Sequence, residues 1–232
     1  MNSRRDFLKL LSLFSFAGSA PLLQAQKLKR TNQPEQPVRI GYLPITDATP
    51  LLVAHAQKLF EKQGIKAEKP IIFRSWSQLV EAFLSGEVNL VHLLSPMSLW
   101  LKYAANAPLK AVMWNHLAGS ALTVQPQIER ISDLGGKTVA IPFWYSIHNI
   151  VVQQLLQANN LSVTTKKPKE NEVKLVVMSR SDMVTALANS VIAGFIVAEP
   201  FNALAEAKGV EKILRFSADV WRDHACCFTW LV

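Results

Sequence analysis

The 232-residue sequence contains only two cysteines, Cys226 and Cys227, and they are adjacent. A framework of disulfides needs separated pairs of cysteines, so the hydrophobic core alone must hold this fold together. Half of the residues are apolar and 18% are charged, which is typical of globular proteins and excludes a disordered chain. The length suffices for one large domain or two small ones.

The sequence also lacks the short motifs of the commonest enzymes. It has no GxGxxG, no phosphate-binding loop, no GxSxG, no HExxH and no separated CxxC pairs. Gly135, Gly136 and Lys137 precede a predicted strand, whereas a phosphate-binding loop follows one. The five histidines are scattered singly. We therefore expect a protein that is not an enzyme and has no cofactor and no metal.

No stripe of basic and aromatic residues is present, although the formal net charge is +8. The one local basic cluster is Lys166, Lys167 and Lys169, in a predicted surface loop. This pattern indicates a solvated basic surface and argues against nucleic-acid binding. Separately, we expect the protein to be a monomer.

The N-terminal residues have the pattern of an export signal. Residues 1–25 contain "SRRDFLK", then the short apolar run "LLSLFSFAG", then small residues that suggest cleavage after Ala25. The run is about half of the roughly 20 residues that a transmembrane helix needs. The paired arginines make the segment similar to a twin-arginine signal peptide, which implies a periplasmic protein. Residues 26–37 are polar, contain Pro34 and Pro37, and form a predicted linker.

Strand and helix patterns alternate along the rest of the chain. We expect strands over 38–44, 69–74, 88–94, 110–116, 137–143, 173–178, 193–199 and 226–232. We expect helices over 48–64, 75–87, 95–108, 146–160, 179–190 and 200–209. Such alternation is typical of an α/β fold with parallel sheets. We predict two lobes, 38–118 and 119–224, joined near 118–126, with 225–232 returning to complete the first lobe.

Several predicted strands are followed by hydroxyl-bearing residues at the start of a helix. Thr46 lies with Asp47 in "PITDATP", Ser75 and Ser95 each begin a helix, and His148 lies in the first turn of another. Helix N-termini attract anions, and ligands of parallel sheets bind beyond the carboxyl ends of the strands. The sequence therefore predicts a cleft for a small, anionic ligand.

Four stretches carry a family resemblance: "IGYLPITDATPLLVAHAQKLFEKQGI", "SWSQLVEAFLSGEVNLVHLLSPM", "ISDLGGKTVAIPF" and "IVAEPFNALAEAKG". With them, residues 38–232 resemble the periplasmic substrate-binding proteins of ABC importers, in the branch for nitrate, bicarbonate, sulfonates such as taurine, and thiamine precursors. The resemblance implies a type II periplasmic-binding-protein fold and a membrane permease of an ABC importer as partner. Members of this family usually continue further, so we expect a chain truncated at its C-terminus.

The resemblance also implies ligand residues. The cleft tryptophan of the nitrate type matches Trp76, and a histidine of the second lobe matches His148. A hinge glutamine is replaced by Ser120, and "HACCF" stands where a lysine is expected, so a ligand other than nitrate is favoured. The candidate ligand-binding residues are Thr46, Asp47, Trp76, Ser95, Ser120, His148, Glu199 and His224.

Structural roles compete with these assignments. Asp47 is more simply a helix cap, and Glu199 more simply forms a hydrogen bond between the lobes. His92 is expected to be a satisfied core histidine, and His55 and His116 are expected to be core or surface residues.

The cysteine pair has two further interpretations. Because neighbours in a strand point to opposite faces, Cys226 and Cys227 are not expected to face the cleft together, which disfavours a metal site. Certain thiamine-pyrimidine synthases share this fold and have a cysteine-rich run ending in "CCF", but they hold pyridoxal phosphate on a lysine. The corresponding stretch here, "VHLLSPMSLW", has His92 and no lysine. An enzyme of that type remains the alternative.

Overall fold

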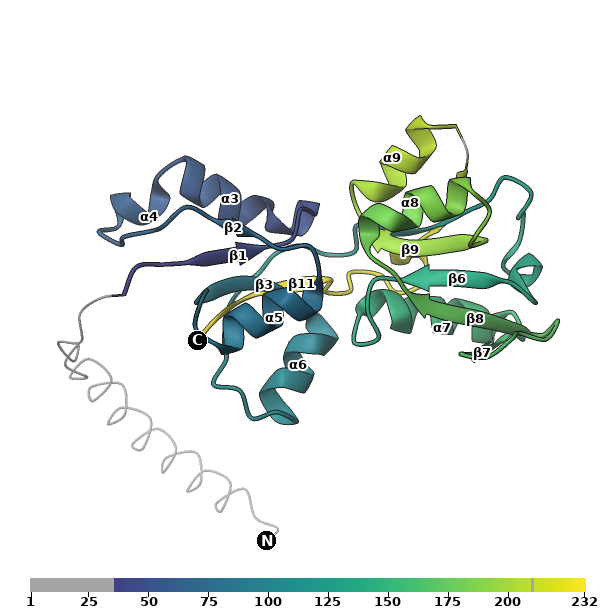
Figure 1. The fold of residues 1–232 in the computed structure, drawn as a ribbon, viewed down its shortest axis with the longest axis horizontal. Coiled ribbons are helices and arrows are strands. Elements are labelled where there is room, and N and C mark those ends of the chain that lie inside the picture. The colour runs from purple at the N-terminus through teal and green to yellow at the C-terminus, as the bar shows by residue number, and fades with distance from the viewer. Residues whose placement is uncertain (1–35, 210) are drawn as a thin grey trace, which may run out of the picture. The chain divides into compact units, whose positions relative to one another are not determined.

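The computed structural model describes residues 36–209 and 211–232 (Figure 1). The predicted signal peptide, 1–25, and all of the predicted linker but its last two residues lie outside these ranges. Among the described residues, no helix combines the length and the apolar character needed to cross a membrane.

The first sheet has five strands in the order β2-β1-β3-β11-β4. The strands are β1 Ile40–Tyr42, β2 Ile71–Ile72, β3 Leu90–Leu94, β4 Lys110–Trp114 and β11 Cys227–Leu231. Strands β1, β2 and β3 are parallel, and β11 lies antiparallel between β3 and β4. Every residue of β3 is buried, as its continuous apolar run predicts. The last strand of the chain thus pairs with two strands from its first half.

Four helices and a 3-10 turn accompany the first sheet. They are η1 Thr46–Ala48, α3 Thr49–Ala56, α4 Leu59–Lys62, α5 Trp76–Leu84 and α6 Ser95–Tyr103. The prediction of one continuous helix over 48–64 is wrong. The chain leaves the helix after Ala56, and Lys58 takes a left-handed conformation with φ of 52°. A left-handed residue cannot continue a right-handed helix, so α4 starts as a separate turn.

The second sheet has six strands in the order β10-β5-β9-β6-β8-β7. The strands are β5 Ser120–Val124, β6 Thr138–Ile141, β7 Ser162–Thr164, β8 Glu172–Val177, β9 Gly194–Ala198 and β10 Lys212–Phe216. Strands β6, β7, β8 and β9 form the parallel part. Strand β5 is antiparallel to both β9 and β10.

The segment 118–126, near which the two predicted lobes join, contains the buried strand β5. The expectation of parallel sheets is wrong in part. Both sheets are mixed, since β5 and β11, which follow the two crossings between the sheets, run antiparallel to their neighbours.

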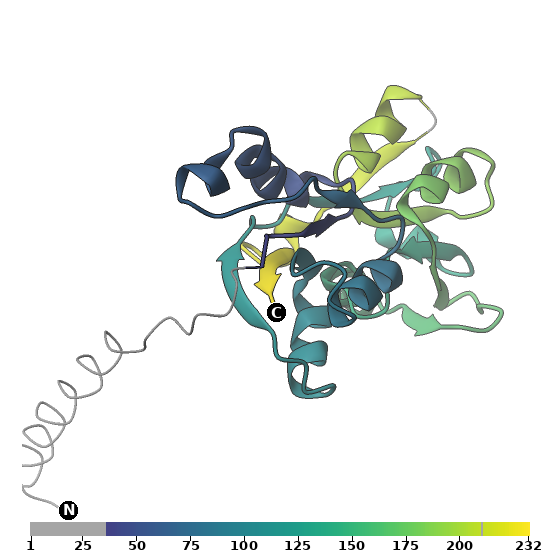
Figure 2. The same ribbon diagram turned by 60° about the vertical axis from the view of Figure 1, so that its left-hand side comes forward.

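Helices α7 Ile147–Ala158, α8 Arg180–Ala188 and α9 Phe201–Ala207 belong to the second half of the chain, and Figure 2 shows them from a second side. Two 3-10 turns, η2 Ile131–Leu134 and η3 Ser217–Asp219, complete it. One cluster of buried apolar residues joins both sheets and includes Leu93, Cys227, Ile141 and Val151. The two sheets therefore share a core.

The N-terminus of α5 is capped as predicted. Ser75 has an extended backbone conformation, and its Oγ accepts a hydrogen bond of 3.2 Å from the amide of Gln78. The cap satisfies one amide that the helix itself leaves without a partner.

We expect Ser75→Ala to lower the free energy of unfolding by about 1 kcal/mol, because it removes this cap. Urea denaturation of the wild type and the variant measures the loss. Ser77→Ala is the matched control, because Ser77 is exposed inside the same helix, and alanine there is expected to be neutral or slightly stabilising. Equal stability of both variants would contradict a role of the cap.

Candidate functional site

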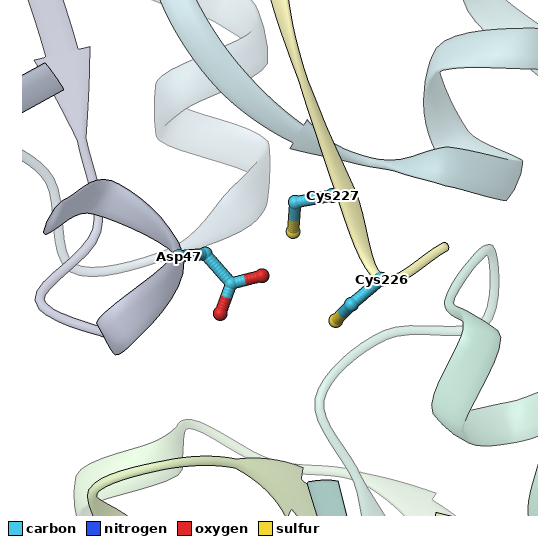
Figure 3. Close-up of side chains that lie close together, drawn as sticks. All are labelled: Asp47, Cys226 and Cys227. Atoms are coloured by element: carbon cyan, nitrogen blue, oxygen red, sulfur yellow. The ribbon is translucent and has the colours of Figure 1, made fainter. Parts of the chain in front are cut away.

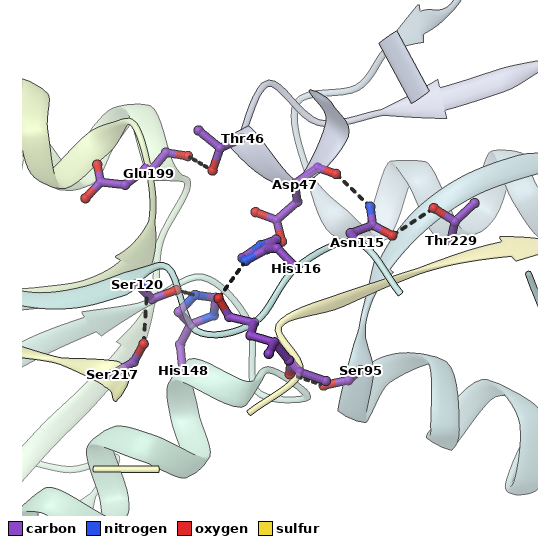
Figure 4. A network of polar contacts seen from close by, with 12 residues as sticks. Thr46, Asp47, Ser95, Asn115, His116, Ser120, His148, Glu199, Ser217 and Thr229 are labelled. Carbon is purple, nitrogen blue, oxygen red and sulfur yellow. Dashed lines mark hydrogen bonds and ion pairs between the residues drawn. The ribbon is translucent and has the colours of Figure 1, made fainter. Parts of the chain in front are cut away.

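Several polar side chains are buried where the chain crosses between the two sheets (Figure 4). We call this group the buried polar centre: Asp47, His116, Ser120, His148, Cys226 and Cys227. All except His116 are almost inaccessible to solvent. Burial of polar groups is unfavourable unless they find partners, so the arrangement of these side chains indicates what the site can do.

Asp47 forms an ion pair with His116. The Nε2 atom of His116 lies 2.7 Å from the Asp47 carboxylate, which is fully buried, whereas a quarter of the His116 side chain is exposed. The hydrogen bond to Asp47 raises the pKa of His116 to about 10. Burial alone would raise the pKa of Asp47, but the hydrogen bond and charge of His116 outweigh it and lower that pKa below its ordinary value. Both groups are therefore charged at neutral pH.

The interpretation of Asp47 as a helix cap is wrong. Asp47 lies inside η1, and no side chain caps either η1 or α3. The interpretation of His116 as an ordinary core or surface histidine missed this ion pair. No local spacing could reveal it, because the two residues lie on separate elements far apart in the sequence.

Asn115 ties the Asp47 turn to the last strand. Its Nδ2 donates to the backbone carbonyl of Asp47 at 2.6 Å, its Oδ1 accepts from Thr229 at 2.8 Å, and its backbone amide donates to the carbonyl of Cys227 at 3.2 Å. A single residue thus fixes the backbone on both sides of the buried polar centre. No pattern in the sequence indicated this role.

Both cysteines face the same point, contrary to expectation. Cys226 precedes β11, so the alternation of strand residues does not apply to this pair. The two Sγ atoms and a carboxylate oxygen of Asp47 all lie within 4.8 Å of one another (Figure 3). Both thiols are free and fully buried. The three side chains form a cluster of candidate metal ligands.

The two thiols differ in acidity. The hydrogen bond from Cys227, with further contacts to His116 and His148, lowers the pKa of Cys226 below its ordinary value. Burial, followed by the interaction with Cys226, raises the pKa of Cys227. The two thiols therefore share one electrostatic environment with Asp47 and His116.

His148 and Ser120 complete the buried polar centre from the second sheet. The Nε2 atom of His148 lies 2.9 Å from the Oγ of Ser120, and the Ser120 amide donates to Ser217 Oγ at 3.3 Å. His148 lies in the first turn of α7, whose Ser146 cap accepts from the amide of Asn149. Its Nδ1 has no hydrogen-bond partner among the described residues, and its ring also acts on the thiol of Cys226.

Trp76, at the start of α5, packs against His92, in β3 of the first sheet. Their ring centroids are 5.5 Å apart in an edge-to-face arrangement, and Trp76 is only 3% exposed. His92 accepts a hydrogen bond of 2.9 Å from the amide of Leu43, and burial lowers its pKa to about 4. It is a buried, neutral histidine, as expected, although within the described chain its Nδ1 has no partner.

Arg180 is a site residue that sequence reasoning missed. Its guanidinium lies 5.9 Å from the Trp76 ring centroid and donates to the carbonyl of Arg74 at 3.3 Å. Arg180 is only 6% exposed, yet no carboxylate among residues 36–209 and 211–232 lies within ion-pair distance of it. Its Nε also has no partner there. Burial lowers its pKa to about 10, so it stays charged at neutral pH.

Arg180 borders a cleft of about 600 Å³ between the two halves of the chain. The lining residues from the first half are Pro44, Ile72, Phe73, Arg74, Ser75 and Gln78, and those from the second half are Ser179, Arg180, Ser181, Asp182 and Phe201. The cleft contains the N-cap residues of two nine-residue helices, Ser75 of α5 and Ser179 of α8. The sequence offered one indication of the second-half side of this cleft, Ser179, which was interpreted only as the start of a helix.

The remaining candidates make local contacts. The backbone carbonyl of Glu199 accepts hydrogen bonds from the amide and the hydroxyl of Thr46 at 3.1 and 3.4 Å. Glu199 thus links the two halves of the chain through its backbone. The carboxylate of Glu199 accepts a hydrogen bond from the amide of Ala203. Ser95 donates to the carbonyl of Ala225 at 2.9 Å. His224 is buried and its Nδ1 lies 2.6 Å from the carbonyl of Trp221. Of the eight predicted ligand residues, Asp47, Ser120 and His148 lie in the buried polar centre, and Trp76 contacts Arg180.

The two mixed sheets, with the chain crossing between them twice, define the periplasmic-binding-protein class of α/β folds, which confirms the predicted fold class. The chain belongs to the NMT1-like family, whose model matches residues 31–232.

Three similar proteins illustrate the relationship. The nitrate/nitrite binding protein NrtA of Nostoc sp. is 22% identical over 229 residues, which cover 90% of this chain and 48% of that protein. The ligand-binding component of an ABC-type import system from Staphylococcus aureus, solved with zinc bound, has a TM-score of 0.73 and 28% identity, covering 84% of this chain and 66% of that one. The periplasmic nitrate-binding protein NrtA from Synechocystis PCC 6803 has a TM-score of 0.74 and 17% identity, covering 85% and 56%. The chain thus spans about half the length of the curated NrtA relative.

Proposed function

We propose that this chain is the periplasmic solute-binding component of an ABC importer and captures a small anionic solute in the cleft beside Arg180. The observation that carries the proposal is the buried guanidinium of Arg180, which faces the cleft without an acidic partner among the described residues. A buried cation of this kind calls for a counter-ion, and a bound anion supplies one. Arginine suits this role because its planar fork binds carboxylate, sulfonate or nitrate oxygens in pairs.

The two helix ends at the cleft support an anionic solute. Ser75, which caps α5, and Ser179, at the N-cap position of α8, lie on opposite sides of the cleft, and each helix presents the positive end of its dipole there. Closing the two halves on the solute is a hinge motion about the segments 115–119 and 217–226, after which the solute is handed to a membrane permease. Export across the inner membrane by the twin-arginine route and the monomeric state are part of the same proposal.

The similar proteins favour binding over chemistry. Two carry names that describe nitrate-binding proteins and one is the ligand-binding component of an import system. For this chain we propose a solute from the same range: nitrate, bicarbonate, taurine or another sulfonate, or a thiamine precursor. The thiamine-pyrimidine synthase alternative predicts bound pyridoxal phosphate, which would show as an absorbance band of the purified chain.

Thermal unfolding in the presence of these solutes tests the function. A solute that binds only the folded chain raises Tm, so we expect one member of the panel to do so. Arg180→Met keeps the apolar stem beside Trp76 and removes the charge, so it should weaken that solute's affinity by about 10- to 100-fold in calorimetric titration.

Arg130→Met is the matched control, because Arg130 is exposed and, within residues 36–209 and 211–232, pairs only with the partly exposed Asp133. It should leave the affinity unchanged. Absence of stabilisation by every solute would contradict the function, and an unchanged affinity of Arg180→Met would place the solute elsewhere.

A further inference from the structure

Asp47, Cys226 and Cys227 form a cluster that has no role in the proposed anion binding. One carboxylate and two thiols, all fully buried, converge from η1 and from the start of β11. In Figure 3 the carboxylate of Asp47 points toward both sulfur atoms. Three potentially anionic groups at one buried point repel one another when ionised, unless a cation lies between them.

The donor spacing suits a tetrahedral ion. Bonds of about 2.3 Å to sulfur and about 2.0 Å to a carboxylate oxygen separate tetrahedral ligand atoms by roughly 3.5 to 3.8 Å. The ligand atoms here lie within 4.8 Å of one another, so small rotamer changes suffice to reach that geometry. Thiolate sulfur combined with a carboxylate selects a borderline-soft divalent ion such as Zn²⁺ over Mg²⁺ or Ca²⁺.

The backbone that carries these ligands is held on several sides. The carbonyls of Ala225 and Cys226 accept from the side chain and amide of Ser95, and Asn115 contacts the backbones of both Cys227 and Asp47. His116 contacts the Asp47 carboxylate at 2.7 Å and can orient it. Such support by neighbouring groups is what metal-binding side chains require.

We propose that Asp47, Cys226 and Cys227 bind one Zn²⁺-class divalent ion, with His116 as the residue that positions the carboxylate. Three protein ligands leave one position of a tetrahedral ion for water or another small ligand. None of the three ligands lines the anion cleft, although the charges of Asp47 and Cys227 act on Arg180. The proposal does not depend on the identity of the imported solute.

Cobalt titration of the full chain, after reduction and removal of metals by a chelator, tests the proposal. We expect one equivalent of Co²⁺ to give a sulfur-to-cobalt charge-transfer band in the near ultraviolet and the visible bands of tetrahedral cobalt, and Zn²⁺ to displace it. Cys226→Ser and Cys227→Ser should each reduce the charge-transfer intensity by about half, because each removes one of two thiolates. Each should also weaken Zn²⁺ binding by more than about 100-fold, and His116→Gln by about 10- to 100-fold.

Asp133→Asn, which changes a partly exposed carboxylate on η2, is the matched control and should bind Co²⁺ like the wild type. Circular dichroism establishes that each variant is folded before titration. A folded, reduced chain without a charge-transfer band overturns the proposal, and so does a band that both cysteine variants retain in full. A Cys226–Cys227 disulfide that persists in the chain purified from the periplasm also overturns it. The solute panel with the Arg180 variant is measured separately, so a failure of the metal site is distinguishable from a failure of the transport function.

Discussion

Asp47→Asn is expected to lower the free energy of unfolding of the metal-free chain by about 3 kcal/mol. The substitution preserves the shape of the side chain but removes the negative charge that His116 faces at 2.7 Å. Removing one member of a buried ion pair leaves the other without compensation, which is more damaging than losing a surface pair. His116 can respond by releasing its proton, which keeps the loss near the lower end of the range for such changes. Denaturation by urea at pH 7 measures the difference.

A double-mutant cycle separates the ion pair from other effects. His116→Gln and the double variant are measured beside Asp47→Asn, and we expect the two losses not to add, because the same interaction disappears in each. In Asp47→Asn the pKa of His116, followed by NMR, should fall from about 10 toward its ordinary value. Additive losses, or an unchanged His116 pKa, would show that the pair does not stabilise the fold.

The stabilisation by this pair also depends on pH. The pKa of His116 is raised to about 10 in the folded chain, so its contribution is complete below about pH 6.5 and is lost as the pH rises through 10. The pKa of Asp47 is lowered, so its contribution is present above about pH 4 and is lost as the pH falls. The difference between the wild type and Asp47→Asn should therefore be largest between about pH 4 and 6.5.

Gly135→Ala is expected to destabilise the second half of the chain by more than about 3 kcal/mol. A Cβ atom at Gly135 would lie 2.1 Å from the backbone carbonyl oxygen of Glu170, a separation that the two chain segments cannot relieve by changing a rotamer. Gly135 has φ of −55° and ψ of 135°, which alanine adopts without strain, so the whole effect is steric. Overpacking against backbone forces segments apart and belongs to the most destabilising kinds of substitution.

Gly64→Ala is the matched control for this steric effect. Gly64 has φ of +74°, and a Cβ atom added there would meet nothing within 4 Å beyond its chain neighbours, so alanine meets conformational strain without a clash. We expect a loss of about 1 kcal/mol. Urea denaturation of both variants compares them directly, and a Gly135→Ala loss no larger than that of Gly64→Ala would contradict the close approach of residues 135 and 170.

Local features of the sequence predicted most helices and strands correctly. Ser75 caps α5 as expected, because a hydroxyl next to the first amides of a helix acts within three residues, and Ser146 caps α7 in the same way. The apolar run of β3 predicted a fully buried strand. The break between α3 and α4 was missed, since the left-handed conformation of Lys58 has no signature in its residue type.

The functional residues were predicted less completely. Trp76 and His148 were found because they lie at helix starts and match family positions, and Ser120 because it replaces a family glutamine; their roles as ligands remain predictions. Arg180 and His116 were missed, because an arginine in a helix and an isolated histidine are ordinary surface residues until burial is known. The cysteines were assigned to opposite faces by strand alternation, which fails at the first residue before the strand.

The sequence by itself determined the α/β alternation, the order of the elements and the membership in the family, because these depend on short-range periodicity and on local motifs. Only the tertiary structure decided that Asp47, His116, Cys226 and Cys227 meet. These residues lie at the two ends and in the middle of the described chain, and two crossings between the sheets bring them together. A contact of that kind depends on how β11 inserts between β3 and β4, which no local pattern encodes.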